Sequence, residues 1–181
     1  KQQQQQTQQR LDEITAELSS LADAVMDACL NIAFEELNSK TGNTVTKNSL
    51  FVLGLGKLGG KELNVSSDVD IIYLYDDFTE NSGHSSGQTI DSYGNMNFYT
   101  KVAERMTTIL TEPTESGYLY RVDTRLRADG SAGPLVRSTD DYMRYLEMRG
   151  KAWERQMLLK ARPSAGNIDA ASAFLRSVAR F

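Results

Sequence analysis

Two aspartates one residue apart, Asp68 and Asp70, are the residues of this chain whose spacing is best suited to chemistry. They open an apolar run that ends at Tyr75, and side chains two positions apart in a strand point to the same face, here continued by Ile72 and Leu74. Two such carboxylates repel each other unless one keeps its proton or a divalent cation such as Mg²⁺ accepts an oxygen from each. The alternative is a solvated pair at a strand end, or an Asp68 that only caps the preceding serine turn.

Two glycine-rich turns precede these aspartates in the segment GLGKLGGKELNVSSDVD, which begins at Gly54. A dinucleotide site would continue from such a turn into a helix, with an acidic residue about 20 positions later. Two serines, an aspartate and another strand follow here instead, so a dinucleotide site is not favoured. A turn whose backbone amides and paired hydroxyls face a phosphate, beside carboxylates that hold a metal, fits the spacing better.

A third aspartate, Asp123, lies in the segment GYLYRVDTRLRADG, where alternation puts Arg121, Arg125 and Arg127 on the same strand face. Like charges at successive positions of one strand face repel each other. This arrangement is therefore unfavourable unless an anion binds the arginines and a cation binds the aspartate. A phosphate bound to a metal supplies both. The alternative is a set of solvated arginines that pair with nearby carboxylates, namely Asp76, Asp77 or Glu62.

Helices and strands must position these residues, and the spacing of apolar residues along the chain predicts where those helices and strands lie. A long amphipathic helix is expected over 8–39, a loop over 41–48, and strands over 50–55 and 69–75. After a polar loop over 76–92 we expect a helix over 93–110 that Pro113 closes, and a third strand over 117–126. Ser138 should cap a helical run to Arg162, with a break near Gly150, and a last helix should run from about Asp169 and still be in progress at Phe181.

Composition narrows the class of protein. The 181 residues include 20 lysines and arginines against 24 acidic residues, a net charge of −4, which argues against sequence-independent binding to nucleic acid. The single cysteine, Cys29, excludes an intrachain disulfide and a cysteine-rich zinc site. No apolar run reaches the roughly 18 residues of a membrane span, and no signal peptide is visible. We therefore expect a cytoplasmic protein that does not attach to membranes.

Three segments in order, GLGKLGGKELNVSSDVD, YRVDTRLRADGSAGPLV and RGKAWERQMLLKAR, resemble the bifunctional adenylyltransferase and adenylyl-removing enzymes that act on glutamine synthetase. The resemblance covers about 50–165 and implies an α+β nucleotidyltransferase fold of the DNA-polymerase-beta type, with a small mixed sheet flanked by helices. It divides the chain into an N-terminal helix and linker (1–48), a catalytic domain (49–165) and the start of a truncated C-terminal helical segment (166–181).

The same resemblance implies roles for individual residues. Nucleotide phosphates are expected at the Gly-Gly turn, the serine and two arginines, and a divalent metal, Mg²⁺ or Mn²⁺, at the three carboxylates. The expected phosphate-binding residues are Gly59, Gly60, Ser67, Arg125 and Arg127. The expected metal ligands are Asp68, Asp70 and Asp123. One departure is Ala128, where the family usually has proline after Leu126-Arg127, which puts the geometry of that turn in doubt.

Local motifs favour one of the family's two catalytic domains. The sequences ELN before the serines, YRVD at Asp123 and WER after Gly150 are typical of the adenylyl-removing domain. That domain would use phosphate to remove AMP from a glutamine synthetase tyrosine, giving ADP, with Arg121 as a catalytic cation for the phosphate. Alternatively, Arg121 only pairs with a neighbouring carboxylate. Trp153 is interpreted as packing rather than as a stacking platform for adenine.

The implied partners are glutamine synthetase, the nitrogen-signalling PII protein, ADP or ATP, and phosphate. Two other functions stay open. The domain could instead adenylylate glutamine synthetase with ATP, or it could be a non-catalytic nucleotide-binding or regulatory module of a larger enzyme.

Overall fold

The computed structural model describes residues 2–41, 49–76 and 92–180, and the structural statements below refer to these ranges. Most of the two loops expected over 41–48 and 76–92 lies outside the described ranges. Within these ranges no helix is both long enough and apolar enough to cross a membrane.

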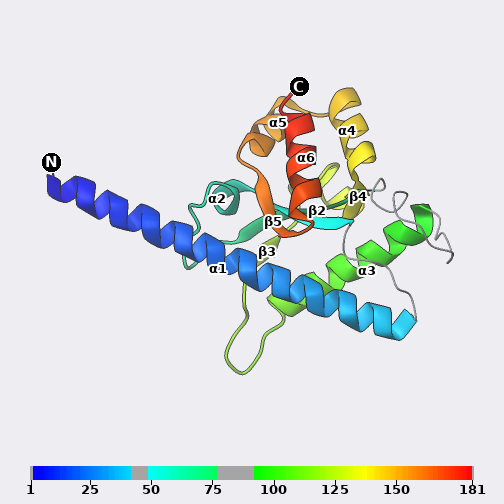
Figure 1. Cartoon of the computed structure of the whole chain (residues 1–181), viewed down its shortest axis with the longest axis horizontal. Helices are drawn as coiled ribbons and strands as arrows, with labels where there is room; N and C mark the ends of the chain where they lie inside the picture. Colours follow the sequence, from blue (N-terminus) through cyan, green and yellow to red (C-terminus); the bar gives the residue numbers. More distant parts are fainter. Residues whose placement is uncertain (1, 42–48, 77–91, 181) are drawn as a thin grey trace.

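A small mixed sheet forms the centre of the molecule (Figure 1). Its strands in the described ranges are β1 (Leu50–Gly54), β2 (Val69–Tyr75), β3 (Val122–Asp123), β4 (Val136–Ser138) and β5 (Arg162–Gly166). The order is β3-β2-β1-β5, and β4 pairs with β2 beyond β3. Strand β1 is antiparallel to β2 and β5, whereas β3 and β4 run parallel to β2. The expected α+β class with a small mixed sheet is confirmed.

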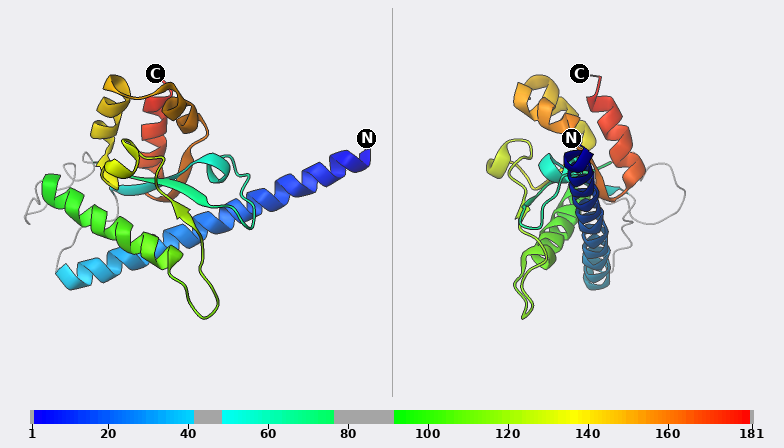
Figure 2. Two further views of the ribbon diagram at one scale, coloured as in Figure 1. Left: turned by 180° about the vertical axis from the view of Figure 1, so that it is seen from behind. Right: turned by 90° about the vertical axis from the view of Figure 1, so that its left-hand side faces the viewer.

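Helices cover both faces of the sheet (Figure 2). On one face, α1 (Gln2–Thr41) and α3 (Ser92–Thr111) pack on the strand residues Val52, Ile71 and Tyr73. On the other face, α4 (Thr139–Met148), α5 (Ala152–Leu159) and α6 (Ile168–Val178) pack on Leu53 and Ile72. Side chains of β1 and β2 alternate between these two apolar clusters, as the period of two in the sequence predicts.

The long first helix is confirmed and spans more of the chain than expected, with its N-terminal part extending away from the rest of the molecule (Figure 1). Its packed part is fixed by polar contacts as well as by apolar burial. Arg105 of α3 donates to Glu36 of α1 at 2.7 and 2.9 Å. The buried hydroxyl of Ser19 accepts a hydrogen bond from the backbone N–H of Leu63, so α1 also supports the segment that leads to β2.

The third expected strand is wrong over most of its length. Only Val122 and Asp123 form a ladder, because β2 offers just Val69 and Asp70 to them and then continues alongside β4. Before β3, a tight turn joins Thr114 to Gly117; after it, the chain turns through a 3-10 helix, η2 (Gly130–Ala132). The arginines around Asp123 are therefore not on one regular strand face.

The C-terminal third also differs from the expected pattern. The break near Gly150 is confirmed, since α4 ends at Met148 and α5 begins at Ala152. Helix α5 ends at Leu159, and Arg162 opens the unpredicted strand β5, whose Pro163 and Gly166 are unfavourable in strand interiors but acceptable at a sheet edge. The last expected helix is confirmed as α6, but it ends at Val178 with Ala179 as its C-cap, so the expectation that it continues to Phe181 is wrong.

Candidate active site

Two of the three aspartates face each other across the β2–β3 ladder. Asp70 and Asp123 are register partners in this parallel pair, so their carboxylates belong to neighbouring strands at one end of the sheet. Val122 packs with the α1 and α3 cluster, which leaves Asp123 on the opposite face, the face of Ile72 and Leu74. The tertiary structure thus brings together two carboxylates that lie far apart in the sequence.

The Asp70 carboxyl has a raised pKa, chiefly because burial removes it from water. The negative charges of Asp123 and then Asp68 raise the pKa further, and the positive charges of Arg125 and Lys57 oppose them. A partly buried carboxylate beside two others is an unfavourable arrangement that a bound cation would relieve. The chemistry of this donor set therefore fits a divalent metal with oxygen ligands.

Gly56, which belongs to the first glycine-rich turn but was not among the expected site residues, lies directly against Asp70. Its φ of 51° is in the left-handed region, and a Cβ added there would be 2.6 Å from Oδ2 of Asp70. The backbone N–H of Leu55 also donates to the carbonyl of Asp70 at 2.8 Å. Glycine at 56 therefore leaves the space in which the carboxylate sits, and the signal that could have found it is the Gly-Leu-Gly turn at the end of β1.

Gly59 and Gly60, expected to bind phosphate, lie in the short helix α2 (Gly56–Gly59) and at its C-cap. Their backbone N–H groups donate to the carbonyls of Leu55 and Gly56, at 2.8 and 3.1 Å. A Cβ on Gly59 would be 2.3 Å from the carbonyl oxygen of Lys160. In this structure both amides are used within the turn, and Gly59 permits the close approach of α2 to the segment before β5.

Ser67 lies near a cation that the sequence analysis also missed. The ammonium of Lys57 is 3.3 Å from the Ser67 hydroxyl, and its positive charge opposes the rise in the pKa of Asp70. Lys57 stands in the turn that places Gly56 against Asp70. A lysine inside a glycine-rich turn was the available signal.

Arg121 pairs with Asp68. Its Nε donates to Oδ1 of Asp68 at 2.6 Å, and its Nη2 donates to the carbonyl of Ser66 at 2.7 Å. Both side chains are about half exposed, so the pair can open to solvent. Arg121 thus lies beside the first aspartate of the Asp-x-Asp motif.

In the part of the chain that the structure describes, no group of three acidic, histidine or cysteine side chains is placed to hold a metal ion.

Arg125 pairs with Asp123 in a fork. Its Nε and Nη2 reach the carboxylate at 3.0 and 2.6 Å, and its backbone N–H donates to Oδ1 at 2.8 Å. These contacts lower the pKa of Asp123, the side-chain hydrogen bond being the main cause. Asp123 is therefore held ionised beside an Asp70 whose pKa is raised, and Arg125 brings a positive charge to both.

Arg127 is directed into the turn after β3. Its guanidinium donates to backbone carbonyls of Thr124, Gly133 and Pro134 at 2.8 to 3.3 Å. These contacts fix the turn in which Ala128 replaces the usual proline, and Ala128 itself is buried. The neighbouring Asp129 has a left-handed φ of 60° and accepts from Arg137 at 2.7 Å. Side-chain contacts therefore order this turn without the proline.

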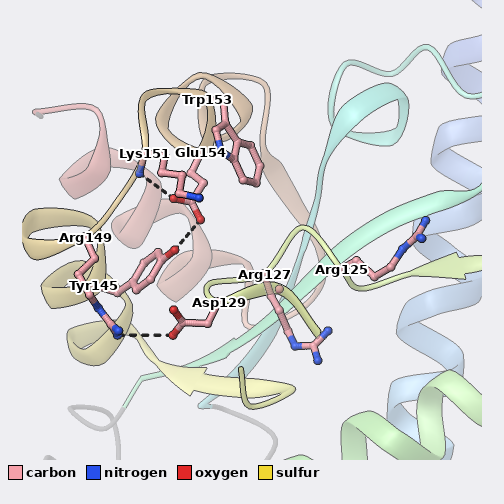
Figure 3. Close-up of a pocket in the computed structure, with 9 residues that line it drawn as sticks. Arg125, Arg127, Asp129, Tyr145, Arg149, Lys151, Trp153 and Glu154 are labelled. Carbon is pink, nitrogen blue, oxygen red and sulfur yellow. Dashed lines mark hydrogen bonds and ion pairs between the residues drawn. The ribbon is translucent and has the colours of Figure 1, made fainter. Parts of the chain in front are cut away.

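A cavity of about 360 Å³ lies between this turn and helices α4 and α5 (Figure 3). Its lining is mostly charged and includes one large aromatic ring. The lining residues are Arg125, Arg127, Asp129, Gly130, Tyr145, Arg149, Lys151, Trp153 and Glu154. Trp153, which we interpreted as packing, is 48% exposed in the structure. Arg125 joins the cavity to the carboxylate pair.

Comparison with known proteins gives the family. A family model described as glutamate-ammonia ligase adenylyltransferase matches residues 2–177. The bifunctional glutamine synthetase adenylyltransferase/adenylyl-removing enzyme of Nitrosococcus oceani is 39% identical over 176 residues, which are 94% of this chain and 18% of that protein. The proteins of the same name from Ralstonia nicotianae and Thioalkalivibrio sulfidiphilus are each 38% identical, over 84% and 94% of this chain and 16% and 17% of theirs.

The chain thus spans less than a fifth of the length of the curated relatives that it matches. The match nevertheless covers all but the first and the last four residues of the chain and includes both carboxylate strands. The chain belongs to the glutamate-ammonia ligase adenylyltransferase family.

Proposed function

We propose that this domain is a nucleotidyltransferase that removes AMP from a tyrosine of glutamine synthetase by phosphorolysis, and so regulates nitrogen assimilation. The observation that carries the proposal is the facing pair Asp70 and Asp123, with the cations Lys57 and Arg125 beside it. Carboxylates for a metal and cations for phosphate are what phosphoryl transfer needs, because its catalysis consists mainly of positioning and charge stabilisation. The names of the relatives add glutamine synthetase as the protein substrate.

Asp70 and Asp123 would hold a Mg²⁺ or Mn²⁺ ion, and Asp68 would join them once Arg121 releases it. The ion, when bound, supplies neutralisation of phosphate charge. Arg125, which holds Asp123, and Lys57, which is 3.3 Å from the Ser67 hydroxyl, would orient the two anionic groups. The Ser67 hydroxyl would assist Lys57 in this role.

The chemical step balances without a covalent intermediate on the protein. An oxygen of hydrogen phosphate attacks the phosphorus of the AMP group and forms the new P–O–P bond. The bond from that phosphorus to the tyrosine oxygen breaks. The proton of hydrogen phosphate ends on the tyrosine, so the products are ADP and an unmodified tyrosine, and the total charge is unchanged.

The direct test incubates this chain with adenylylated glutamine synthetase, phosphate and Mg²⁺, and measures ADP. We expect ADP to form with wild type and its rate to fall at least a hundredfold in Asp123→Asn. A matched control is Asp140→Asn, which changes an exposed carboxylate of α4. Consumption of ATP to modify unadenylylated synthetase would show that the reaction runs in the other direction, and nucleotide binding without turnover would favour a regulatory module.

A variant of Arg121 tests whether the domain removes AMP, as proposed, or adds it. We propose that it moves between Asp68 and the incoming phosphate, and the support is its half-exposed position beside the carboxylates. Arg121→Glu, which reverses the charge at this position, should raise the apparent KM for phosphate while the thermal midpoint and metal affinity stay close to wild type. An unchanged KM would leave Arg121 with a structural role only.

The location and further partners follow from the same resemblance. We propose a cytoplasmic protein that responds to the PII signalling protein, which a binding assay between purified PII and this chain would test. Loss of binding on removing α1 would place the PII contact on that helix, whereas no binding to the intact chain would place it elsewhere in the longer relatives.

A further inference from the structure

The cavity next to Asp123 is positively charged although the chain as a whole is negative. Four cationic residues line it against two acidic ones, whereas the net charge of the chain is −4. Such a local excess of arginine and lysine favours an anionic ligand. The volume of about 360 Å³ lies within the range of roughly 300–1,000 Å³ that is usual for small-molecule sites.

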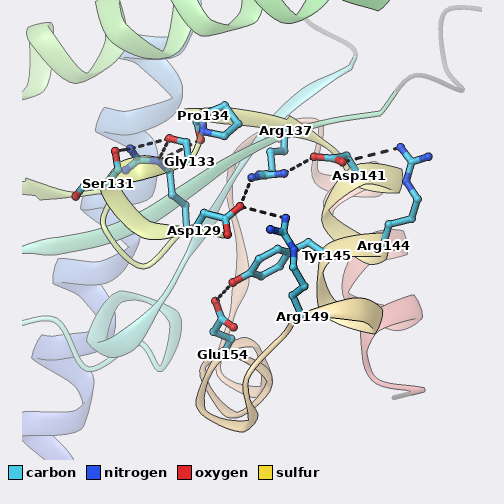
Figure 4. Close-up of polar contacts among 11 residues, drawn as sticks. Asp129, Ser131, Gly133, Pro134, Arg137, Asp141, Arg144, Tyr145, Arg149 and Glu154 are labelled. Carbon is cyan, nitrogen blue, oxygen red and sulfur yellow. Dashed lines mark hydrogen bonds and ion pairs between the residues drawn. The ribbon is translucent and has the colours of Figure 1, made fainter.

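The two acidic residues of the lining are already used by the protein (Figure 4). Glu154 is buried, accepts from the Tyr145 hydroxyl at 2.7 Å and accepts from the backbone N–H of Lys151 at 2.7 Å. Asp129 accepts from Arg137 at 2.7 Å. These contacts fix the wall of the cavity and leave little acidic capacity to neutralise its remaining cations.

Three cationic side chains are exposed at the cavity surface. The Lys151 ammonium makes no ion pair with any residue in the described ranges. The Arg149 guanidinium is 63% exposed, and its ion pair with Asp129 is long, at 3.5 Å. Arg125 is 75% exposed even though it holds Asp123. The Arg149 guanidinium also lies 5.3 Å from the centre of the Tyr145 ring, which fixes its orientation.

Trp153 adds a planar apolar surface to the same cavity. It lies on α5 beside Glu154, and the turn that carries Asp129 and Arg127 lies across the cavity from it (Figure 3). A half-exposed indole ring next to several cations is suited to a ligand that is flat and aromatic at one end and anionic at the other. Neither feature alone selects such a ligand, but together they match a nucleotide.

We propose that this cavity binds the adenine nucleotide, with the base against Trp153 and the phosphates held by Arg149, Lys151 and Arg125. The inference takes the adenine nucleotide from the proposed function and adds where it binds. Arg125 then contacts both the nucleotide and Asp123, so it directs the phosphates toward the carboxylate pair.

Trp153 provides the measurement, because it is the only tryptophan of the chain. Titration of the wild-type chain with ADP should change its intrinsic fluorescence in a saturable way. Adenosine should give the same change at a concentration at least tenfold higher, since it lacks the phosphates. Inorganic phosphate should compete with ADP but should alter the fluorescence little, and potassium chloride at the same ionic strength should do neither. A fluorescence that stays unchanged at saturating ADP would overturn the stacking of the base.

Variants separate the two halves of the site. By calorimetry, the double variant Arg149→Gln/Lys151→Gln should bind ADP at least tenfold more weakly but adenosine as well as wild type does. Trp153→Leu should weaken both ligands, and Trp153→Phe should restore most of the loss. Arg144→Gln is the matched control, because Arg144 is an exposed arginine of α4 that pairs with Asp141 outside the cavity.

These binding measurements do not depend on turnover. A failure of the proposed nucleotide site can therefore be distinguished from a failure of the proposed function. ADP binding that depends on Trp153 and Arg149, without any ADP production from adenylylated synthetase, would support the site and contradict the activity. Activity that persists with an unchanged ADP affinity in both variants would overturn the site and leave the activity standing. Thermal midpoints of all variants, measured alongside, identify any that fail to fold.

Discussion

The carboxylate of Asp70 is the point at which opposing electrostatic effects meet. Burial and the charges of Asp123 and Asp68 disfavour its ionised form, while Arg125 and Lys57 favour it, and the net result is a raised pKa. The side chain is therefore poorly stabilised by the protein alone, which is the expected property of a residue that serves a bound cation.

Replacing Asp70 by asparagine should stabilise the metal-free protein at neutral pH. A carboxyl whose pKa is higher in the folded than in the unfolded state destabilises the fold once pH rises above its unfolded value near 3.8, and does so fully above the folded value. The thermal midpoint of Asp70→Asn in EDTA should therefore exceed that of wild type at pH 7, and the difference should vanish near pH 3.

With added Mg²⁺ the wild type should have the higher thermal midpoint of the two, because the ion stabilises only the chain that can bind it. Glu147→Gln, an exposed acidic residue of α4, should behave like wild type in both conditions. A lower midpoint of Asp70→Asn in EDTA at pH 7 would contradict the assigned effect of burial and neighbouring charge.

Gly56 should be needed for the position of Asp70 and not only for its own backbone conformation. Gly56→Ala places a Cβ against Oδ2 of Asp70 and adds left-handed strain of about 1–2 kcal/mol. Gly130→Ala is the matched control, since Gly130 has a φ of 56° but its nearest neighbour would be 3.6 Å from the added Cβ. Both variants should lose similar stability in urea denaturation, whereas only Gly56→Ala should lose the Mg²⁺-dependent rise in thermal midpoint.

Between elements, Arg162 connects parts of the chain that the sequence does not show to be neighbours. From β5 its Nε donates to the carbonyl of Leu58 in α2 at 3.1 Å, and its Nη1 donates to Asp23 of α1. Both partners of the ion pair are largely buried. The turn that carries Gly56 is thereby tied to the long first helix and to the edge strand.

Asp23→Ala should destabilise the protein by about 1.5–3 kcal/mol, the range for a hydrogen bond to a charged group in a partly buried place. The measurement is the free energy of unfolding in urea. The control is Glu62→Ala, which removes the exposed pair with Lys160 at 3.7 Å and should change stability by less than about 1 kcal/mol. Equal losses in the two variants would show that burial of the Arg162 pair contributes nothing.

Across the whole molecule, α1 is divided into a packed and an exposed part. Residues 2–14 are exposed throughout, whereas Met26, Leu30 and Phe34 are buried against the sheet and α3. Exposed helical turns without tertiary contacts contribute little to stability, because helices depend on packing of an apolar face.

Removing residues 1–10 should therefore leave the thermal midpoint within about 2 °C of wild type, a change expected for the loss of chain that packs on nothing. Removing residues 1–20 should lower it clearly, because Ser19, which accepts from the N–H of Leu63, is lost as well. Circular dichroism melts of the two truncations decide this. Similar midpoints for both would mean that the contact of Ser19 does not hold α1 to the sheet.

Local patterns in the sequence determined the main elements and the faces of the two long strands. The period of two in 69–75 predicted that Ile72 and Leu74 lie opposite Ile71 and Tyr73, and the structure confirms this in two separate apolar clusters. Helical spacing likewise predicted α1 and α3, and Gly150 marked the break between α4 and α5. These features depend on residues that are close in the sequence, so a single chain is enough to reveal them.

Only the tertiary structure decided which partner each functional side chain contacts. Strand β3 is only two residues long because the rest of the β2 edge is paired with β4. Residues 162–166 have weak strand preference, but they form β5 because β1 offers them a free edge to pair with. Arg121 lies on Asp68 and Arg125 on Asp123, and Gly56 leaves room for Asp70. Except for Arg125 and Asp123, which are two residues apart, these contacts join separate segments of the chain. No periodicity of the sequence encodes the approach of one segment to another.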